Sequence, residues 1–176
     1  MELETKTVEH GRDSIFSDLR NTEDLEPDQE GNVTIGGPRF NIMGAEYFMA
    51  GTLEVLRETY GEGAGGIIKN SGRDYGEEIV DIVYTDRDPQ RQFGYVLGFL
   101  KFLGYSHPEV EDGSISFSSS PTAEAHRKDY GEDGHVCYFL GGILTGAASK
   151  IFDEEVVFHE TECIAEGDDS CVFEMK

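Results

Sequence analysis

The chain has 176 residues, enough for one domain with a substantial apolar core. Its 14 Lys and Arg stand against 36 Asp and Glu, so the formal net charge is −22. This balance excludes a general binder of the nucleic-acid backbone and argues against binding to anionic membranes. Because the acidic residues are spread along the whole chain, we expect a halophilic protein adapted to a salt-rich cytosol, with an acidic partner-binding surface as the alternative.

Composition narrows the class of protein further. The 11 Phe and 8 Tyr argue against a disordered acidic chain. The sequence has no apolar run of about 18 residues, and Met1–Arg12 lacks the apolar segment of a signal peptide. We therefore expect a cytoplasmic protein without a transmembrane helix. The odd number of 3 cysteines argues against a disulfide framework and leaves free thiols, a redox site or metal ligands.

The first part of the chain divides into an arm and the start of a domain. Residues 1–31 are polar and predict an N-terminal arm or linker, with Ser14–Leu19 as a short helix or a dimerisation arm. Residues 32–176 form the predicted domain. It opens with short strands and a turn over Asn32–Ile42, where apolar residues flank Gly36-Gly37-Pro38.

Three helices are predicted next. Apolar residues at three- and four-residue steps indicate a helix that begins at Ile42 and stops at Gly61, and a second over Gly66–Tyr84. Asp88-Pro89 opens a third, whose body Phe93–Leu103 is apolar nearly all round and must be covered on both sides or line a cavity. Residues 61–66 fit G-x-G-x-x-G but follow a helix instead of a strand, so they predict an interhelical loop and not a dinucleotide site.

The C-terminal half alternates between strands and a helix. Strands are predicted at Gly113–Ser119, within Glu154–Ile164 and at Cys171–Met175, and a helix rich in small residues at Val136–Ala148. Thr122–Tyr130 is polar and gives no clear pattern. Helices followed by a closing hairpin indicate an α+β fold, an antiparallel sheet with helices packed on it.

The cysteines carry the chemical signal. A hairpin brings Cys163 and Cys171 close together, and Cys137 lies at the start of a helix, where the dipole favours a thiolate. With Glu160 they make a four-coordinate set suited to structural zinc. Spacing alone leaves His159 and Glu162 as rival fourth ligands, and three unrelated buried cysteines as the simpler interpretation.

Residues Glu160–Phe173 fit E-x-x-C-x-x-x-G-x-x-x-C-x-F and resemble the closing signature of the 4-vinyl reductase domain family. Cys137, the glycines that follow it and the segment Ser120–His126 resemble the family's preceding helix and loop. The family includes sensory domains of aromatic-responsive sigma-54-type activators, archaeal stand-alone proteins described as hydrocarbon binders, and an accessory protein of bacteriochlorophyll synthesis. The resemblance implies the NO-signalling/Golgi-transport ligand-binding fold, which vesicle-tethering subunits share.

The resemblance also implies a site. The family's sensors hold a structural zinc at positions that match Cys137, Glu160, Cys163 and Cys171, bind an aromatic ligand in an enclosed apolar pocket nearby and dimerise through their N-terminal part. The candidate pocket walls are aromatic residues that an ordinary core would also explain: Tyr47, Phe48, Phe93, Phe99, Phe102, Phe117 and Tyr138. The chain has no Trp, so phenol specificity is not carried over.

These observations predict a zinc-stabilised small-molecule-binding or sensing domain, expected to be a homodimer. Its ligand would be hydrophobic or aromatic, and because the sequence shows no ATPase or DNA-binding domain, it would act through a separate regulatory protein. The first alternative is a dimerising adaptor without a ligand. The second is a reductase or a tetrapyrrole-pathway accessory protein, which no nucleotide motif or general-base constellation supports, so enzymatic activity is not expected.

Overall fold

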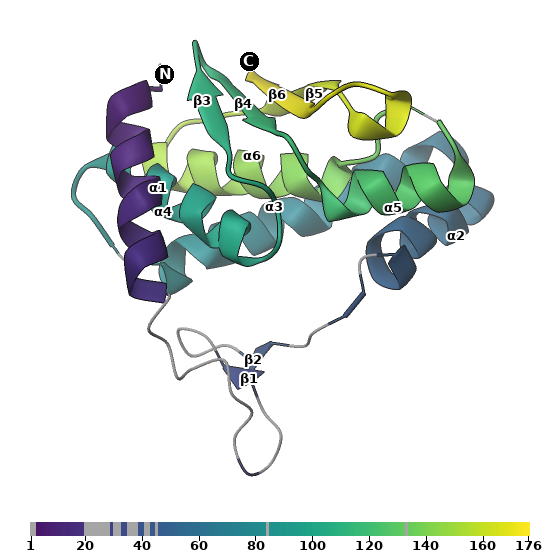
Figure 1. The fold of residues 1–176 in the computed structure, drawn as a ribbon, viewed down its shortest axis with the longest axis horizontal. Helices are drawn as coiled ribbons and strands as arrows, with labels where there is room; N and C mark the ends of the chain where they lie inside the picture. Colours follow the sequence, from purple (N-terminus) through teal and green to yellow (C-terminus); the bar gives the residue numbers. More distant parts are fainter. Residues whose placement is uncertain are drawn as a thin grey trace.

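The computed structural model describes residues 3–19, 29, 33–34, 39–40, 43–44, 46–83, 85–132 and 134–176. Helices pack on a four-stranded antiparallel sheet with the order β3-β4-β6-β5, which confirms the predicted α+β class (Figure 1). The helices are α1 (Thr5–Leu19), α2 (Gly51–Tyr60), α3 (Ala64–Ile82), α4 (Pro89–Phe102), α5 (Pro121–Tyr130) and α6 (Tyr138–Phe152). The sheet strands are β3 (Glu109–Glu111), β4 (Ser114–Phe117), β5 (Phe158–Glu162) and β6 (Cys171–Met175).

The element boundaries follow local sequence signals. Asp88 caps α4 by accepting a hydrogen bond from the Gln90 amide, with Pro89 in the first turn, as predicted. Ser120 and Pro121 start α5 in the same way, although its polar sequence had given no clear pattern. The predicted interhelical loop at residues 61–66 is a 3-10 turn, Gly61–Gly63, that runs directly into α3.

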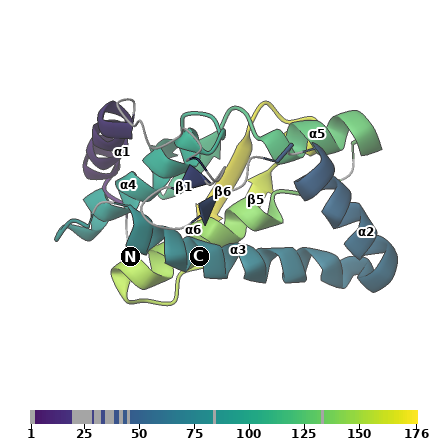
Figure 2. The same cartoon turned by 90° about the horizontal axis from the view of Figure 1, so that it is seen from below.

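Helix α6 lies between the sheet and α3 (Figures 1 and 2). Strands β4 and β6 point Ile115, Phe117 and Phe173 into the core, where none of the three is exposed. An added Cβ on Gly141 of α6 would lie 3.2 Å from the Phe173 ring, so the small residue lets the sheet approach the helix closely.

Helices α3 and α6 pack backbone against backbone. A Cβ on Gly72 would overlap the Phe139 carbonyl, and one on Gly76 would overlap the Ile143 carbonyl. From the other side, a Cβ on Gly142 would overlap the Lys69 carbonyl. Because the contacted residue numbers rise together, the two helices run parallel. The small residues of the predicted helix therefore serve the α3–α6 contact.

Helix α1 packs on α4 by the same means, with the two helices antiparallel. A Cβ on Gly11 would overlap the Arg91 carbonyl, and one on Gly94 would overlap the Val8 carbonyl. The buried Arg12 side chain donates to the Pro108 carbonyl. The helix thus begins nine residues before the predicted Ser14–Leu19 segment. The structure leaves the division of the chain at residue 31 a prediction.

Two further expectations concern residues 32–42 and α4. A short hairpin pairs β1 (Val33–Thr34) with β2 (Arg39–Phe40), and the predicted turn at residues 36–38 lies outside the described residues. Helix α4 is buried from Gln92 through Leu100, because it packs against both α1 and α6. It is therefore covered on both sides, which was one of the two predicted alternatives. No helix within the described ranges is long and apolar enough to cross a membrane.

Candidate functional site

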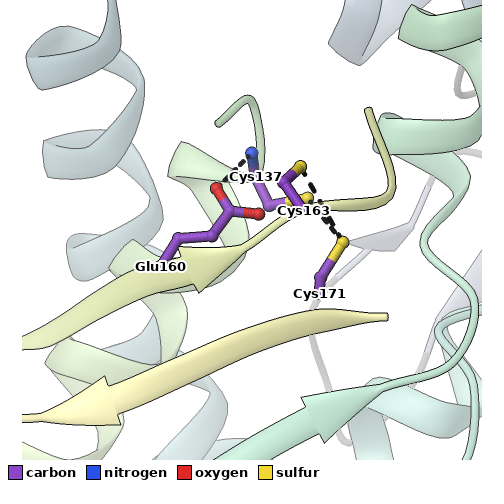
Figure 3. A group of neighbouring side chains, drawn as sticks. All are labelled: Cys137, Glu160, Cys163 and Cys171. Atoms are coloured by element: carbon purple, nitrogen blue, oxygen red, sulfur yellow. Dashed lines mark hydrogen bonds between the residues drawn. The ribbon is translucent and has the colours of Figure 1, made fainter. Parts of the chain in front are cut away.

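The structure brings the four predicted metal ligands together (Figure 3). Cys137 directly precedes α6, Glu160 lies in β5, Cys163 follows β5 and Cys171 begins β6. One ligand atom from each lies within 4.8 Å of all the others. We call this group the Cys/Glu cluster.

A strand irregularity explains why Glu160 and Cys163 meet. Residues three apart in a regular strand point to opposite faces. The pairing of β5 with β6 shifts register between Glu160 and Glu162, which resets the alternation and turns Cys163 inward. His159 and Glu162 are exposed, so of the three rival fourth ligands only Glu160 is turned toward the sulfurs.

The geometry of the cluster fits zinc. The sulfur of Cys171 lies 3.5 Å from that of Cys137 and 4.0 Å from that of Cys163. Sulfurs bound to one tetrahedral zinc at about 2.3 Å would lie about 3.8 Å apart. One Glu160 oxygen accepts a hydrogen bond from the Cys137 amide at 3.1 Å, and the other is buried without a partner. That second oxygen supplies the fourth donor.

The electrostatics of the cluster favour a bound cation. Burial, and then the neighbouring Cys163, raises the pKa of Glu160 to about 9. Hydrogen bonds with Cys163 and Cys171, followed by burial, raise the pKa of Cys137. Without a cation, the buried carboxyl and thiol groups therefore hold protons. Since metal ligands bind in the deprotonated form, cation binding would release these protons.

Groups around the cluster fix its ligands. The Ser120 hydroxyl lies 3.3 Å from the Cys137 sulfur, and the Ile164 amide donates to the Cys171 sulfur at 3.5 Å. The Asp168 carboxylate accepts from the Cys163 amide at 2.8 Å. Ser120 was not predicted as a site residue. Its Ser-Pro pair signals a helix start, but no sequence pattern links it to Cys137.

The predicted ligand-pocket residues do not form one site. Phe93, Phe99 and Phe117 are fully or almost fully buried in the core. The Phe93 ring stacks on Phe158 with centroids 6.2 Å apart, and Phe99 stacks on Phe102 at 6.0 Å. These four predicted residues line none of the hollows described below, because they pack against other core rings. The side chain of Tyr47 lies outside what the structure describes.

Phe48 instead lines an apolar groove. Two adjoining hollows, of about 290 and 350 Å³, share Phe48, Met49, Tyr75 and Phe139 as walls. Tyr105 and Ile143 extend the second hollow. We call these six residues the apolar groove. Phe48 and Met49 come from a π-helical turn at Glu46–Ala50, a rare conformation that is frequent at functional sites.

The groove combines aromatic walls with few polar groups. The rings of Tyr75 and Phe139 stack with centroids 5.8 Å apart. Burial raises the pKa of both Tyr75 and Tyr105, so their hydroxyl groups are neutral. Met49 and Tyr75 stand on apolar stripes of the predicted helices, where sequence reasoning assigned them to the core. Nothing in the sequence joins them to Tyr105 or Phe139.

Tyr138, the remaining predicted residue, lines a separate hollow of about 290 Å³ beside the Cys/Glu cluster. Cys137 and Glu160 are also part of its wall, with Gly66, Lys69 and His135. We call this hollow the cluster pocket.

Comparisons with known proteins agree with the predicted family. The family model of the vinyl-4-reductase domain matches residues 122–176, which include the Cys/Glu cluster and the closing motif. This match to the C-terminal third of the chain confirms the resemblance drawn from that motif. The uncharacterized protein MJ1460 of the archaeon Methanocaldococcus jannaschii is 47% identical over 80 residues, 43% of this chain and 49% of that protein. The chain thus aligns with about half the length of this relative.

Two further matches are proteins that respond to or bind phenol. The phenol regulator MopR of Acinetobacter guillouiae is 34% identical over 58 residues, 32% of this chain and 10% of MopR. The phenol-responsive sensory domain of the transcription activator PoxR, solved with phenol, superimposes with a TM-score of 0.78 at 20% identity. That match covers 93% of this chain and 89% of the PoxR chain, and it confirms the expected fold.

Proposed function

We propose that this protein is a zinc-stabilised domain that binds a small aromatic or apolar molecule in the apolar groove and acts through a separate protein partner. The observation that carries the proposal is the groove itself, whose aromatic walls enclose hollows of about 290 and 350 Å³. Ligand pockets are typically apolar hollows of this order with a few placed polar groups. The phenol-related matches support the same ligand class.

Zinc would be held by Cys137, Glu160, Cys163 and Cys171. It would act as a structural cross-link, since four protein donors leave no open position for water. Three thiols and one carboxyl group surround a space of the right size, and one carboxylate oxygen lacks a partner. The cross-link would hold the closing hairpin against the start of α6.

The cluster also positions the groove. Phe139, a groove wall, lies two residues after Cys137 on the first turn of α6. Ser120, which contacts the Cys137 sulfur, directly precedes Pro121 and Thr122 at the floor of the second hollow. Fixing Cys137 therefore fixes two walls, so loss of the metal would weaken ligand binding.

Calorimetric titration with toluene, phenol and 2-naphthol tests the groove in the full chain. We expect saturable binding of at least one compound. Phe48 is 49% exposed, so Phe48→Ala should weaken binding by about tenfold with little loss of stability. The matched control is Val55→Ala, an exposed apolar side chain on α2 outside the groove. The proposal fails if none of the compounds binds, or if both variants bind as tightly as the wild type.

A ligand-free adaptor is the second candidate function. Val55, Tyr60 and Ile67 are 63%, 59% and 45% exposed on α2 and α3, and such apolar side chains suit a protein partner. An adaptor would lose assembly in Val55→Ala and show no dependence on Phe48 in ligand titrations. Light scattering of both variants separates the two functions.

We further propose that the protein works as a homodimer in a salt-rich cytoplasm, with residues 1–31 as the dimerising arm. The net charge of −22 supports the salt requirement, because screening weakens self-repulsion. Light scattering of the full chain and of a chain without residues 1–31, both in molar KCl, measures the contribution of the arm.

A further inference from the structure

The cluster pocket is placed differently from the apolar groove. Its walls come from the first turns of α3 and α6 and from β5, and it includes two members of the Cys/Glu cluster, Cys137 and Glu160. The other two members, Cys163 and Cys171, do not line it and are not exposed at all. The cluster therefore meets this pocket on its Glu160 side.

Glu160 has the least restrained ligand atom of the cluster. Its first oxygen is fixed by the Cys137 amide at 3.1 Å, but its second oxygen has no partner. Each sulfur, by contrast, lies within 4.0 Å of at least one other sulfur of the cluster. A donor that enters the cluster pocket would thus meet the carboxylate before it meets Cys163 or Cys171.

One cation in the pocket wall is available to an incoming anion. The Lys69 ammonium group donates to the Phe158 carbonyl at 2.8 Å, and the structure gives it no carboxylate partner among the residues described. Lys150, on the same pair of helices, is instead paired with Asp81 at 2.8 Å. In a chain with a net charge of −22, a half-buried cation without an acidic partner favours the approach of an anion.

We propose that the cluster pocket is the access route to the metal site, and that small anionic ligands such as thiolates and carboxylates enter it to exchange with Glu160. The inference rests on the metal part of the proposed function. The carboxylate oxygen would be replaced by the incoming donor atom, with no change in oxidation state. The three buried sulfurs would keep their places during the exchange.

A plug in the pocket tests the route. Gly66 lines the pocket, and a Cβ there would meet nothing within 4 Å, so Gly66→Phe adds a ring without a backbone clash. Gly63 is equally open but lies outside the pocket wall, which makes Gly63→Phe the matched control. We expect zinc release to an excess of a colorimetric chelator to slow at least about tenfold in Gly66→Phe only. Metal content and melting temperature should stay unchanged in both variants.

Equal release rates in all three proteins, matching the rate of global unfolding, would overturn the route. A metal-free readout separates this inference from the zinc proposal. Iodoacetamide should label Cys137 before Cys163 and Cys171, and Gly66→Phe should slow that labelling. Failure to bind zinc, with labelling as expected, would remove the metal part of the proposed function and leave the pocket as the access route to Cys137. Uniform labelling, or labelling unaffected by the plug, would overturn the inference in either case.

Discussion

The Cys/Glu cluster and the apolar groove lie next to each other on α6 but are specified in opposite ways. Cys137 precedes the helix, and the groove wall Phe139 lies two residues later. All four cluster residues fall within positions 137–171, in a motif with fixed spacing. The groove draws its walls from positions 48–143 with no shared spacing. A site of few, chemically distinct ligands can be read from a sequence, whereas a site of common apolar residues is defined only by the fold.

The largest expected effect comes from breaking the cluster. Cys163→Ser or Cys171→Ser should abolish zinc binding and lower the free energy of unfolding by more than about 4 kcal/mol, because metal binding contributes directly to folding. Elemental analysis and denaturant titration measure both quantities. Ser116→Ala, in β4, serves as the control. Unchanged metal content in both cysteine variants would reject the site, and unchanged ligand binding would separate the groove from the cluster.

A smaller effect is expected from the contact that supports both sites. Gly142→Ala places a Cβ against the Lys69 carbonyl and should cost about 2–3 kcal/mol of unfolding free energy. Gly66→Ala, on the open side of α3, should instead add about 0.5–1 kcal/mol. Thermal unfolding compares the two. If Gly142→Ala is as stable as the wild type, α3 and α6 do not hold the cluster and the groove in a fixed relation.

The smallest effect is confined to the groove and depends on pH. Burial raises the pKa of Tyr105 above its ordinary value of 10.0, so folding favours the neutral phenol. This contribution to stability is complete below pH 10.0 and is lost as the pH rises above it, where the unfolded tyrosine ionises. Tyr105→Phe should therefore lose less stability than the wild type between about pH 9 and about pH 11.

Denaturant titration across that pH range measures the difference. Tyr60→Phe, an exposed side chain on α2, should follow the wild type. An identical alkaline loss in wild type and Tyr105→Phe would contradict the burial of the Tyr105 hydroxyl at the groove floor.

Strong local signals made parts of the fold predictable. Asp88-Pro89 begins α4 where expected, and β6 has the predicted limits Cys171–Met175. The cysteine spacing anticipated the cluster, but only the family resemblance favoured Glu160 over His159 and Glu162. The physical reason is the register shift in β5, which no periodicity in the sequence reveals.

Other elements depend on contacts far away in the chain. Helix α1 has a polar sequence, and what fixes it is the approach of Gly11 and Val8 to α4. Phe93 and Phe117 have the composition of pocket walls, yet they pack against other rings in the core. Whether an aromatic side chain faces a hollow or a neighbour is decided by tertiary packing, which composition and spacing do not encode.

The parallel course of α3 and α6 has an electrostatic consequence. Each helix carries about half a positive charge at its N-terminus and half a negative charge at its C-terminus. Parallel alignment places both positive ends beside Cys137 and Glu160, so the donors that must lose protons to hold a cation lie in a field that stabilises their anions. At the opposite end, Lys150 in the last turn of α6 donates to the Glu77 carbonyl of α3 at 2.8 Å, which places a cation beside both negative ends. The helix pair is thus a single aligned dipole whose positive pole faces the cluster.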